Sequence, residues 1–287
     1  GGSADFGSTV SRGVRVTDTD PAKEVYSGYA SLALVSATEL HAAWLDWRGS
    51  DQAASIYAAR SLDGGGRFQP NVLVASNVCP CCRPSVVVGP QREIIVVWRN
   101  VYPDGSRDMA SSVSIDGGRT FQGPFRVAVD GWKIRGCPDS GAATVRAGRR
   151  VYVAWLTEGG FDHAGIRLSW SDDGGRTFAP PLLASASVLD ANHPSMAVTA
   201  EGRVLLALEG RVPGQDGGWG KRRPWLVEID EKGHLEEPQP IPVPPDAPAV
   251  MRPVVAAGSV GRVFMAWTEL QDRRPRIMLA RGRRTGP

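Results

Sequence analysis

A short turn motif recurs along this chain and limits its possible folds more than any other feature. Residues 114–121 read SIDGGRTF, residues 171–178 read SDDGGRTF, and residues 61–68 carry a partial copy, SLDGGGRF. The Asp side chain can accept hydrogen bonds from backbone N–H groups a few residues further on, which closes a turn. The Gly pair takes positive φ at no steric cost, as a tight connection between antiparallel strands requires. The motif therefore predicts a succession of β-hairpins.

A second repeat surrounds these turns. Apolar segments end in Trp at Trp44, Trp98, Trp155 and Trp267, and Leu208 fills the same place between the last two. The steps between these positions are 54, 57, 53 and 59 residues. Repeats of this period indicate stacked supersecondary units. Because no long segment carries a helical period of 3.6, we expect an all-β chain.

Each repeat unit is expected to contain four short strands, which is the pattern of a propeller blade. Three strands of a fifth unit are present, but the chain ends without its fourth. We therefore expect a strand from residues 10–17 to pair beside residues 276–281, which would complete the last blade and remove an open edge. The prediction is a single domain over residues 1–287, a five-bladed β-propeller. A six-bladed propeller is the alternative.

Composition narrows the possible partners. Apolar residues make up 42% of the chain, which excludes wholesale disorder, and the net charge of +3 argues against a nucleic-acid binder. No apolar run approaches the roughly 20 residues of a membrane-spanning helix. A small molecule, a metal or a glycan is the expected ligand, and a protein partner stays possible. Three of the four cysteines lie in residues 79–82, which favours a periplasmic or secreted protein.

The turn motif S-x-D-x-G-x-T-F resembles the Asp-box, or BNR, repeat of sialidases and related β-propellers. The resemblance implies the propeller fold, and it implies that these turns are structural rather than catalytic. The segment CPCC at residues 79–82, followed by GCP at residues 136–138, more loosely resembles exported bacterial proteins labelled sialidase-like without a demonstrated glycosidase site.

Propeller geometry places the connections between blades on one face, together with the loops that follow the Trp strands. Function concentrates in such long, individually different loops. One hypothesis for this face is a glycoside hydrolase acting on acidic sugars. Resemblance to the sialidases implies an arginine clamp for a carboxylate, an acidic residue and a Tyr nucleophile. The candidates are Arg83, Arg135, Asp139, Arg252 and Trp219 for ligand binding, and Glu158 and Glu209 for catalysis.

Two departures weaken the comparison with sialidases themselves. All five tyrosines lie within the first 152 residues, whereas the nucleophile of that family comes late in the chain. The Arg-Ile-Pro signature of the family is also missing. Efficient sialidase activity is therefore not expected, and whether the chain catalyses any reaction stays open.

The other hypothesis, and the leading one, is a pocket that binds a ligand or a soft metal. Cys79 and Cys82 have C-x-x-C spacing, and the segment containing Cys137 leads into the next blade at the same level. Thiolate, thioether and imidazole ligands suit copper(I), or zinc where only sulfur and nitrogen bind. The candidate ligands are Cys79, Cys81, Cys82, Cys137, His193 and Met251. Structural disulfides are the alternative, for instance between one cysteine of residues 79–82 and Cys137.

Overall fold

The computed structural model describes residues 12–20, 22–23, 25–49, 53–160, 164–211, 220–230, 232–259, 261–271 and 274–283. All of the regular secondary structure in these residues is β-strand, which confirms the all-β prediction. Accordingly, this part of the chain contains no helix that could cross a membrane.

The strands form five antiparallel sheets, and within each sheet the strands follow chain order. The first sheet contains β1 (Ser27–Leu34), β2 (Leu40–Asp46), β3 (Ala54–Ser61) and β4 (Val72–Val78). The second contains β5 (Ser85–Val88), β6 (Ile94–Arg99), β7 (Met109–Ser114) and β8 (Gln122–Arg126). The third contains β9 (Ala143–Ala147), β10 (Arg150–Thr157), β11 (Gly165–Ser171) and β12 (Leu182–Leu183). The fourth contains β13 (Leu189–Val198), β14 (Val204–Arg211), β15 (Arg223–Ile229) and β16 (Gln239–Pro240). The fifth contains β17 (Val250–Ala257), β18 (Arg262–Gln271) and β19 (Arg274–Arg283).

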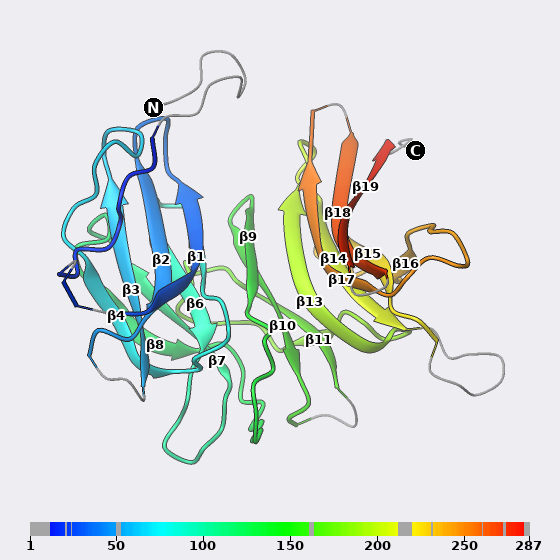
Figure 1. The fold of residues 1–287 in the computed structure, drawn as a ribbon, viewed down its shortest axis with the longest axis horizontal. Coiled ribbons are helices and arrows are strands. Elements are labelled where there is room, and N and C mark those ends of the chain that lie inside the picture. Colours follow the sequence, from blue (N-terminus) through cyan, green and yellow to red (C-terminus); the bar gives the residue numbers. More distant parts are fainter. Residues whose placement is uncertain are drawn as a thin grey trace.

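The first strands of the five sheets lie side by side, so the molecule is an all-β propeller. Figure 1 shows the first sheet in blue and cyan on one side, the last in orange and red on the other, with β9 and β13 between them. Hydroxyl groups link neighbouring sheets along these innermost strands. Ser31 accepts the backbone N–H of Val86 at 3.2 Å, and Ser195 accepts that of Val255 at 3.3 Å. The described residues thus provide one sheet for each predicted repeat.

The Trp-bearing strands form the core because both of their faces are covered by neighbouring sheets. All six residues of β6 are buried, and the side chains of Trp98 and Trp155 are fully buried. A buried indole N–H needs an acceptor. In three sheets it is the residue two positions later, as for Trp44, which donates to Asp46 at 2.9 Å. Trp98 donates to Asn100 and Trp267 to Glu269 in the same way.

The repeated turns close as their residues predict. The Oδ1 atom of Asp116 accepts the hydroxyl of Ser114 at 2.7 Å and the backbone N–H of Thr120 at 3.0 Å. The other carboxylate oxygen accepts the Thr120 hydroxyl at 2.6 Å. Gly117 and Gly118 have φ of 71° and 81°, in the left-handed region. Asp173 makes the same bonds to Ser171 and Thr177, so each turn satisfies its own polar groups.

The N-terminal segment does not close the last sheet as predicted. Its residues 12–17 form no strand, and they lie against the first sheet rather than beside β19. Asn71 donates to the carbonyl of Val16 at 2.9 Å, and the Asp18 carboxylate accepts from Arg48 at 2.6 Å. These polar contacts hold the segment at the edge of β4. The fifth sheet consequently has three strands among the described residues, while residues 10 and 11 lie outside them.

Candidate functional site

A cavity of about 440 Å³, which we call the axial pocket, is lined by residues that lie in, or shortly before, the first strand of each sheet. Its aromatic and ionisable side chains are Tyr29, Arg83, Asp139, His193 and Arg252. They are 54, 56, 54 and 59 residues apart, so they occupy equivalent places in the five repeats. The repeat therefore brings five different side chains, namely a phenol, a carboxylate, an imidazole and two guanidinium groups, to one place.

The backbone at four of these positions is unusual. The φ angles are 58° at Tyr29, 48° at Asp139, 47° at His193 and 52° at Arg252. Residues with a side chain seldom adopt this left-handed conformation, and strained backbone of this kind gathers at functional sites. Strand pairing is also irregular beside three of them, in β1, β13 and β17. Such bulges re-aim a side chain, which here places it on the axial pocket.

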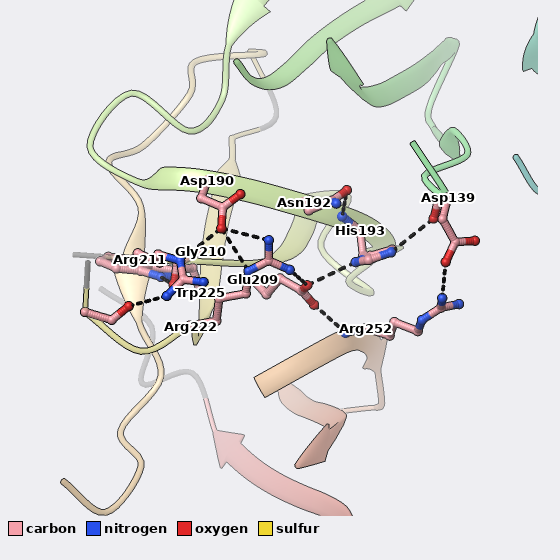
Figure 2. A network of polar contacts seen from close by, with 11 residues as sticks. Asp139, Asp190, Asn192, His193, Glu209, Gly210, Arg211, Arg222, Trp225 and Arg252 are labelled. Carbon is pink, nitrogen blue, oxygen red and sulfur yellow. Dashed lines mark hydrogen bonds and ion pairs between the residues drawn. The ribbon is translucent and has the colours of Figure 1, made fainter. Parts of the chain in front are cut away.

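Glu209 is a fully buried carboxylate on β14, directly opposite Asn192 of β13. One of its oxygens accepts from His193 Nδ1 at 3.0 Å and from Arg222 Nη1 at 3.1 Å. The other accepts the backbone N–H of Arg252. Figure 2 shows these three donors converging on Glu209 from different elements. A buried charge requires such partners, so Glu209 serves as a fixed anchor for two residues of the pocket.

The imidazole of His193 is held on both sides. Its Nε2 atom lies 3.1 Å from the backbone carbonyl oxygen of Asp139, and its Nδ1 atom faces Glu209. Both oxygens act only as acceptors, so both bonds are made together when both ring nitrogens carry a proton. In that state the carboxylate of Glu209 balances the charge of the imidazolium. The ring thus connects the third and fourth sheets across the pocket wall.

The two arginines of the pocket differ in their partners. The guanidinium of Arg252 pairs with the carboxylate of Asp139, an interaction visible in Figure 2. Arg83 is exposed, and its side chain makes no hydrogen bond or ion pair with any described residue. An exposed guanidinium without an internal carboxylate is available to an anionic ligand. Arg83 is therefore the guanidinium of the pocket lining that has no partner among the described residues.

A second charged layer supports Glu209 from behind. Asp190 accepts from Arg222 at 2.7 Å and from Arg211 at 2.9 Å (Figure 2). Burial would raise the pKa of Asp190, but the hydrogen bonds from Arg211 and Arg222 outweigh it and hold the pKa below its ordinary value. Asp190 therefore stays charged at neutral pH and keeps Arg222 oriented toward Glu209.

The structure gathers some of the residues proposed from sequence and separates others. Arg83, Asp139, His193 and Arg252 line the axial pocket, whereas Glu209 lies behind its wall. Glu158 is exposed after β10, and neither it nor the exposed Arg135 lines the pocket. Glu158 and Glu209 are therefore not a catalytic pair, because Glu209 is buried and already accepts three hydrogen bonds. Trp219 lies outside the described residues.

The four cysteines fall into two pairs. Cys81 and Cys137 form a disulfide, and Cys81 also lines the axial pocket. Cys79 and Cys82 are free and buried, with their Sγ atoms 3.2 Å apart. A hydrogen bond from the thiol of Cys82 lowers the pKa of Cys79 to about 6, with help from Arg99 and Arg107. The same bond, together with burial, raises the pKa of Cys82.

The set of six metal ligands proposed from sequence does not assemble. Two of its four cysteine sulfurs are joined in the disulfide, and both ring nitrogens of His193 face oxygen atoms. Met251 lies in β17, paired with Thr268 of β18. The disulfide alternative thus holds for one pair of cysteines and not for the other. A disulfide is typical of extracellular and periplasmic proteins.

Sequence analysis did not single out Tyr29 and Arg222, although both belong to this arrangement. A signal for Tyr29 exists, because it precedes Arg83 by the same 54 residues that separate Trp44 from Trp98. Arg222 carries no such signal, since its role depends on the position of Glu209. Alignment of the repeats would identify Tyr29 and would still miss Arg222.

Comparisons with known proteins establish the fold. No known family and no curated protein matches the sequence. A protein of unknown function from Dyadobacter fermentans is similar in structure, with a TM-score of 0.58 and 15% identity over 88% of this chain and 79% of that one. The GH93 α-L-arabinofuranosidase of Fusarium graminearum, in complex with arabinobiose, has a TM-score of 0.56 and 12% identity, over 86% of this chain and 81% of that one. A PL25 ulvan lyase bound to a glucuronate–sulfated rhamnose ligand has a TM-score of 0.52 and 14% identity, over 86% of this chain and 65% of that one. At these identities the likeness concerns the fold alone.

Proposed function

We propose that this chain is a carbohydrate-active propeller whose axial pocket binds an acidic glycan. The observation that carries the proposal is the pocket itself, to which each of five repeats brings one aromatic or ionisable side chain, with left-handed backbone at four of those residues. Natural chains keep such strain where a site requires it. The structures of two similar proteins, the GH93 arabinofuranosidase and the ulvan lyase, contain bound sugars, which supports a sugar as the ligand here.

The charge of the pocket supports an acidic sugar. Asp139, the carboxylate of the pocket lining, is paired with Arg252, and Glu209 is paired behind the wall. Arg83 keeps an exposed guanidinium with no described partner. A guanidinium binds a carboxylate through two parallel hydrogen bonds. We therefore assign Arg83 to the carboxylate of a sugar acid such as a uronate.

The test compares two arginines of the same face. Arg83→Gln should weaken binding of a glucuronate-containing oligosaccharide roughly ten- to hundred-fold in calorimetry, the value of a charge-assisted hydrogen-bond pair. Arg135→Gln, at an exposed site off the pocket, should leave the affinity unchanged. The same oligosaccharide with its carboxylates reduced to alcohols should bind poorly. Equal binding of the reduced oligosaccharide, or an equal loss in both variants, would refute the proposal.

Cleavage of the bound glycan is a second candidate function, and the pocket chemistry favours elimination over hydrolysis. Hydrolysis uses two carboxylic groups roughly 5–10 Å apart. The lining of the axial pocket provides one carboxylate, Asp139, and Arg252 already neutralises it. In elimination, a base removes the proton beside the uronate carboxylate, the glycosidic C–O bond breaks, and an acid protonates the leaving oxygen. Arg83 would neutralise the carboxylate, while Tyr29 is the proton-transferring candidate, because both ring nitrogens of His193 already face oxygen atoms.

The two reactions give different products. Elimination leaves an unsaturated uronate that absorbs in the ultraviolet, whereas hydrolysis releases reducing ends without that absorbance. We expect ultraviolet-absorbing product from the wild-type chain, and Tyr29→Phe should reduce its rate of formation while leaving affinity intact. Reducing ends without absorbance would instead support the glycoside hydrolase that the sequence offered as the alternative to a ligand- or metal-binding pocket.

A further inference from the structure

We propose that Cys79 and Cys82 form a two-coordinate site for copper(I). Their Sγ atoms lie 3.2 Å apart in the turn that follows β4, and each residue is 1% exposed. The other two cysteines are joined in a disulfide, so this is the pair of thiols left free in the described chain. Soft thiolate ligands favour copper(I), and they also bind zinc.

The donor set argues for copper(I) and against zinc. A structural zinc site takes four ligands. Within the described residues, the cluster that could hold a metal contains Cys79, Cys81 and Cys82, and the disulfide removes Cys81 from it. Two sulfurs therefore remain, and no imidazole or carboxylate joins them. Metal–sulfur bonds of roughly 2.3 Å require the two sulfurs to move apart by about 1 Å, which a change of side-chain torsion provides.

The surrounding charge suits a monovalent ion held by two thiolates. Such a complex carries one net negative charge. Arg107 Nη1 lies 3.9 Å from the Cys79 sulfur, and the buried Arg99 donates to three backbone carbonyls nearby. Among the described residues neither guanidinium makes a close ion pair with a carboxylate, although Arg99 interacts with Asp130 at longer range. A divalent ion with the same two ligands would be neutral and would offset neither guanidinium charge, whereas the copper(I) complex offsets one.

The site lies close to the axial pocket. Cys81 lines the axial pocket, and its sulfur is 3.8 Å from that of Cys79. The copper site would therefore lie directly behind the wall of the glycan pocket. Neither Cys79 nor Cys82 lines that pocket, so the two sites share no binding residue. Copper binding and glycan binding can consequently succeed or fail independently.

The experiment titrates the purified full chain with copper(I) held by a coloured chelator, with ascorbate present, which keeps copper reduced and leaves disulfides intact. We expect about one copper(I) per chain to leave the chelator, and X-ray absorption should report two sulfur ligands. Cys82→Ser should abolish uptake. The double variant Cys81→Ser, Cys137→Ser is the matched control, and it should still take up one ion because it keeps both ligands.

Three results would overturn the proposal. They are the absence of copper uptake by a wild-type chain with two titratable thiols, full uptake by Cys82→Ser, and a Cys79–Cys82 disulfide in the purified chain. Because Cys82→Ser could also unfold the protein, a second measurement uses the wild-type chain alone. Its melting temperature should rise when copper(I) is added and should not rise with zinc, as ligand binding to the native state requires.

Discussion

The two ends of the repeat units are stabilised in opposite ways. At the turn end, Asp116 bonds residues within four positions of itself, and Asp173 repeats the pattern in the next sheet. At the pocket end, His193 bonds Asp139 from 54 residues away, and Arg252 reaches Asp139 across 113 residues. Because each turn makes its hydrogen bonds within itself, the turns are alike and interchangeable. Contacts between sheets make each pocket residue different, which is the condition for recognising a ligand.

The largest effect is expected where the pocket end depends on one buried group. Glu209→Ala should lower the free energy of unfolding by about 3–5 kcal/mol, because it leaves the donors of His193, Arg222 and Arg252 without their acceptor. Urea denaturation measures the change. Glu158→Ala, at an exposed carboxylate, should change stability by less than about 0.5 kcal/mol. Similar values for both variants would contradict the role given to Glu209.

The next effect tests how closely the segments leading into the innermost strands approach one another. A Cβ atom at Gly141 would lie 2.1 Å from the backbone oxygen of Arg83. Gly141→Ala should therefore cost about 1–3 kcal/mol and weaken glycan binding by displacing Arg83. Gly282→Ala, where a Cβ meets nothing within 4 Å, should be nearly neutral in both measurements. Unchanged stability of Gly141→Ala would show that the two segments can separate.

A smaller loss is expected at the turn end. Asp173→Ala removes the acceptor for Ser171 and Thr177 and should cost about 1–2 kcal/mol, with Asp116→Ala close to it. Glycan affinity should not change, since the turn satisfies its own polar groups and takes no part in the axial pocket. Asp172→Ala is the control, because it removes only a surface pair with Arg150 at 3.1 Å. A loss of affinity in Asp173→Ala would break the separation between the two ends.

The turn aspartates should also give the fold an acid-dependent component. Burial opposes the shift at Asp173, but hydrogen bonds led by the Thr177 hydroxyl lower its pKa to about 2. A lowered pKa adds stability above the ordinary value near 4, and that stability is lost as pH falls from about 4 to 2. Because the residue is exposed, the loss should be at most about 1 kcal/mol. Unfolding curves at several pH values should show a shallower dependence for Asp173→Ala than for the wild type.

The smallest expected effect is the absence of efficient sialidase activity. A fluorogenic sialoside should show no efficient turnover, because the late Tyr and the Arg-Ile-Pro signature of the sialidases are missing from the sequence. The axial pocket includes a tyrosine from the first sheet, Tyr29, and none from the later repeats. Turnover that disappears in Arg252→Ala would contradict this prediction and would return the pocket to a sialidase mechanism.

Sequence predicted the features that repeat. The turns at residues 114–121 and 171–178 and the buried Trp strands follow from local hydrogen bonding and apolar pattern, and both are present in the structure. The predicted closure of the last sheet by residues 10–17 is not present, because the described part of the N-terminal segment bonds Asn71 and Arg48 beside the first sheet instead. A missing strand and a spare segment do not establish a pairing, since polar side chains elsewhere compete for that segment.

The sequence by itself determined the all-β repeat, the turn chemistry and the places where pocket residues such as Arg83 and His193 would occur. These depend on contacts within a few residues or on a regular period. Only the tertiary structure decided that Glu209 serves His193 as a buried partner rather than as a catalytic acid, and that Cys81 pairs with Cys137 and leaves Cys79 beside Cys82. Those outcomes depend on which sheets lie side by side, and that is a property of the packed sheets rather than of any one repeat.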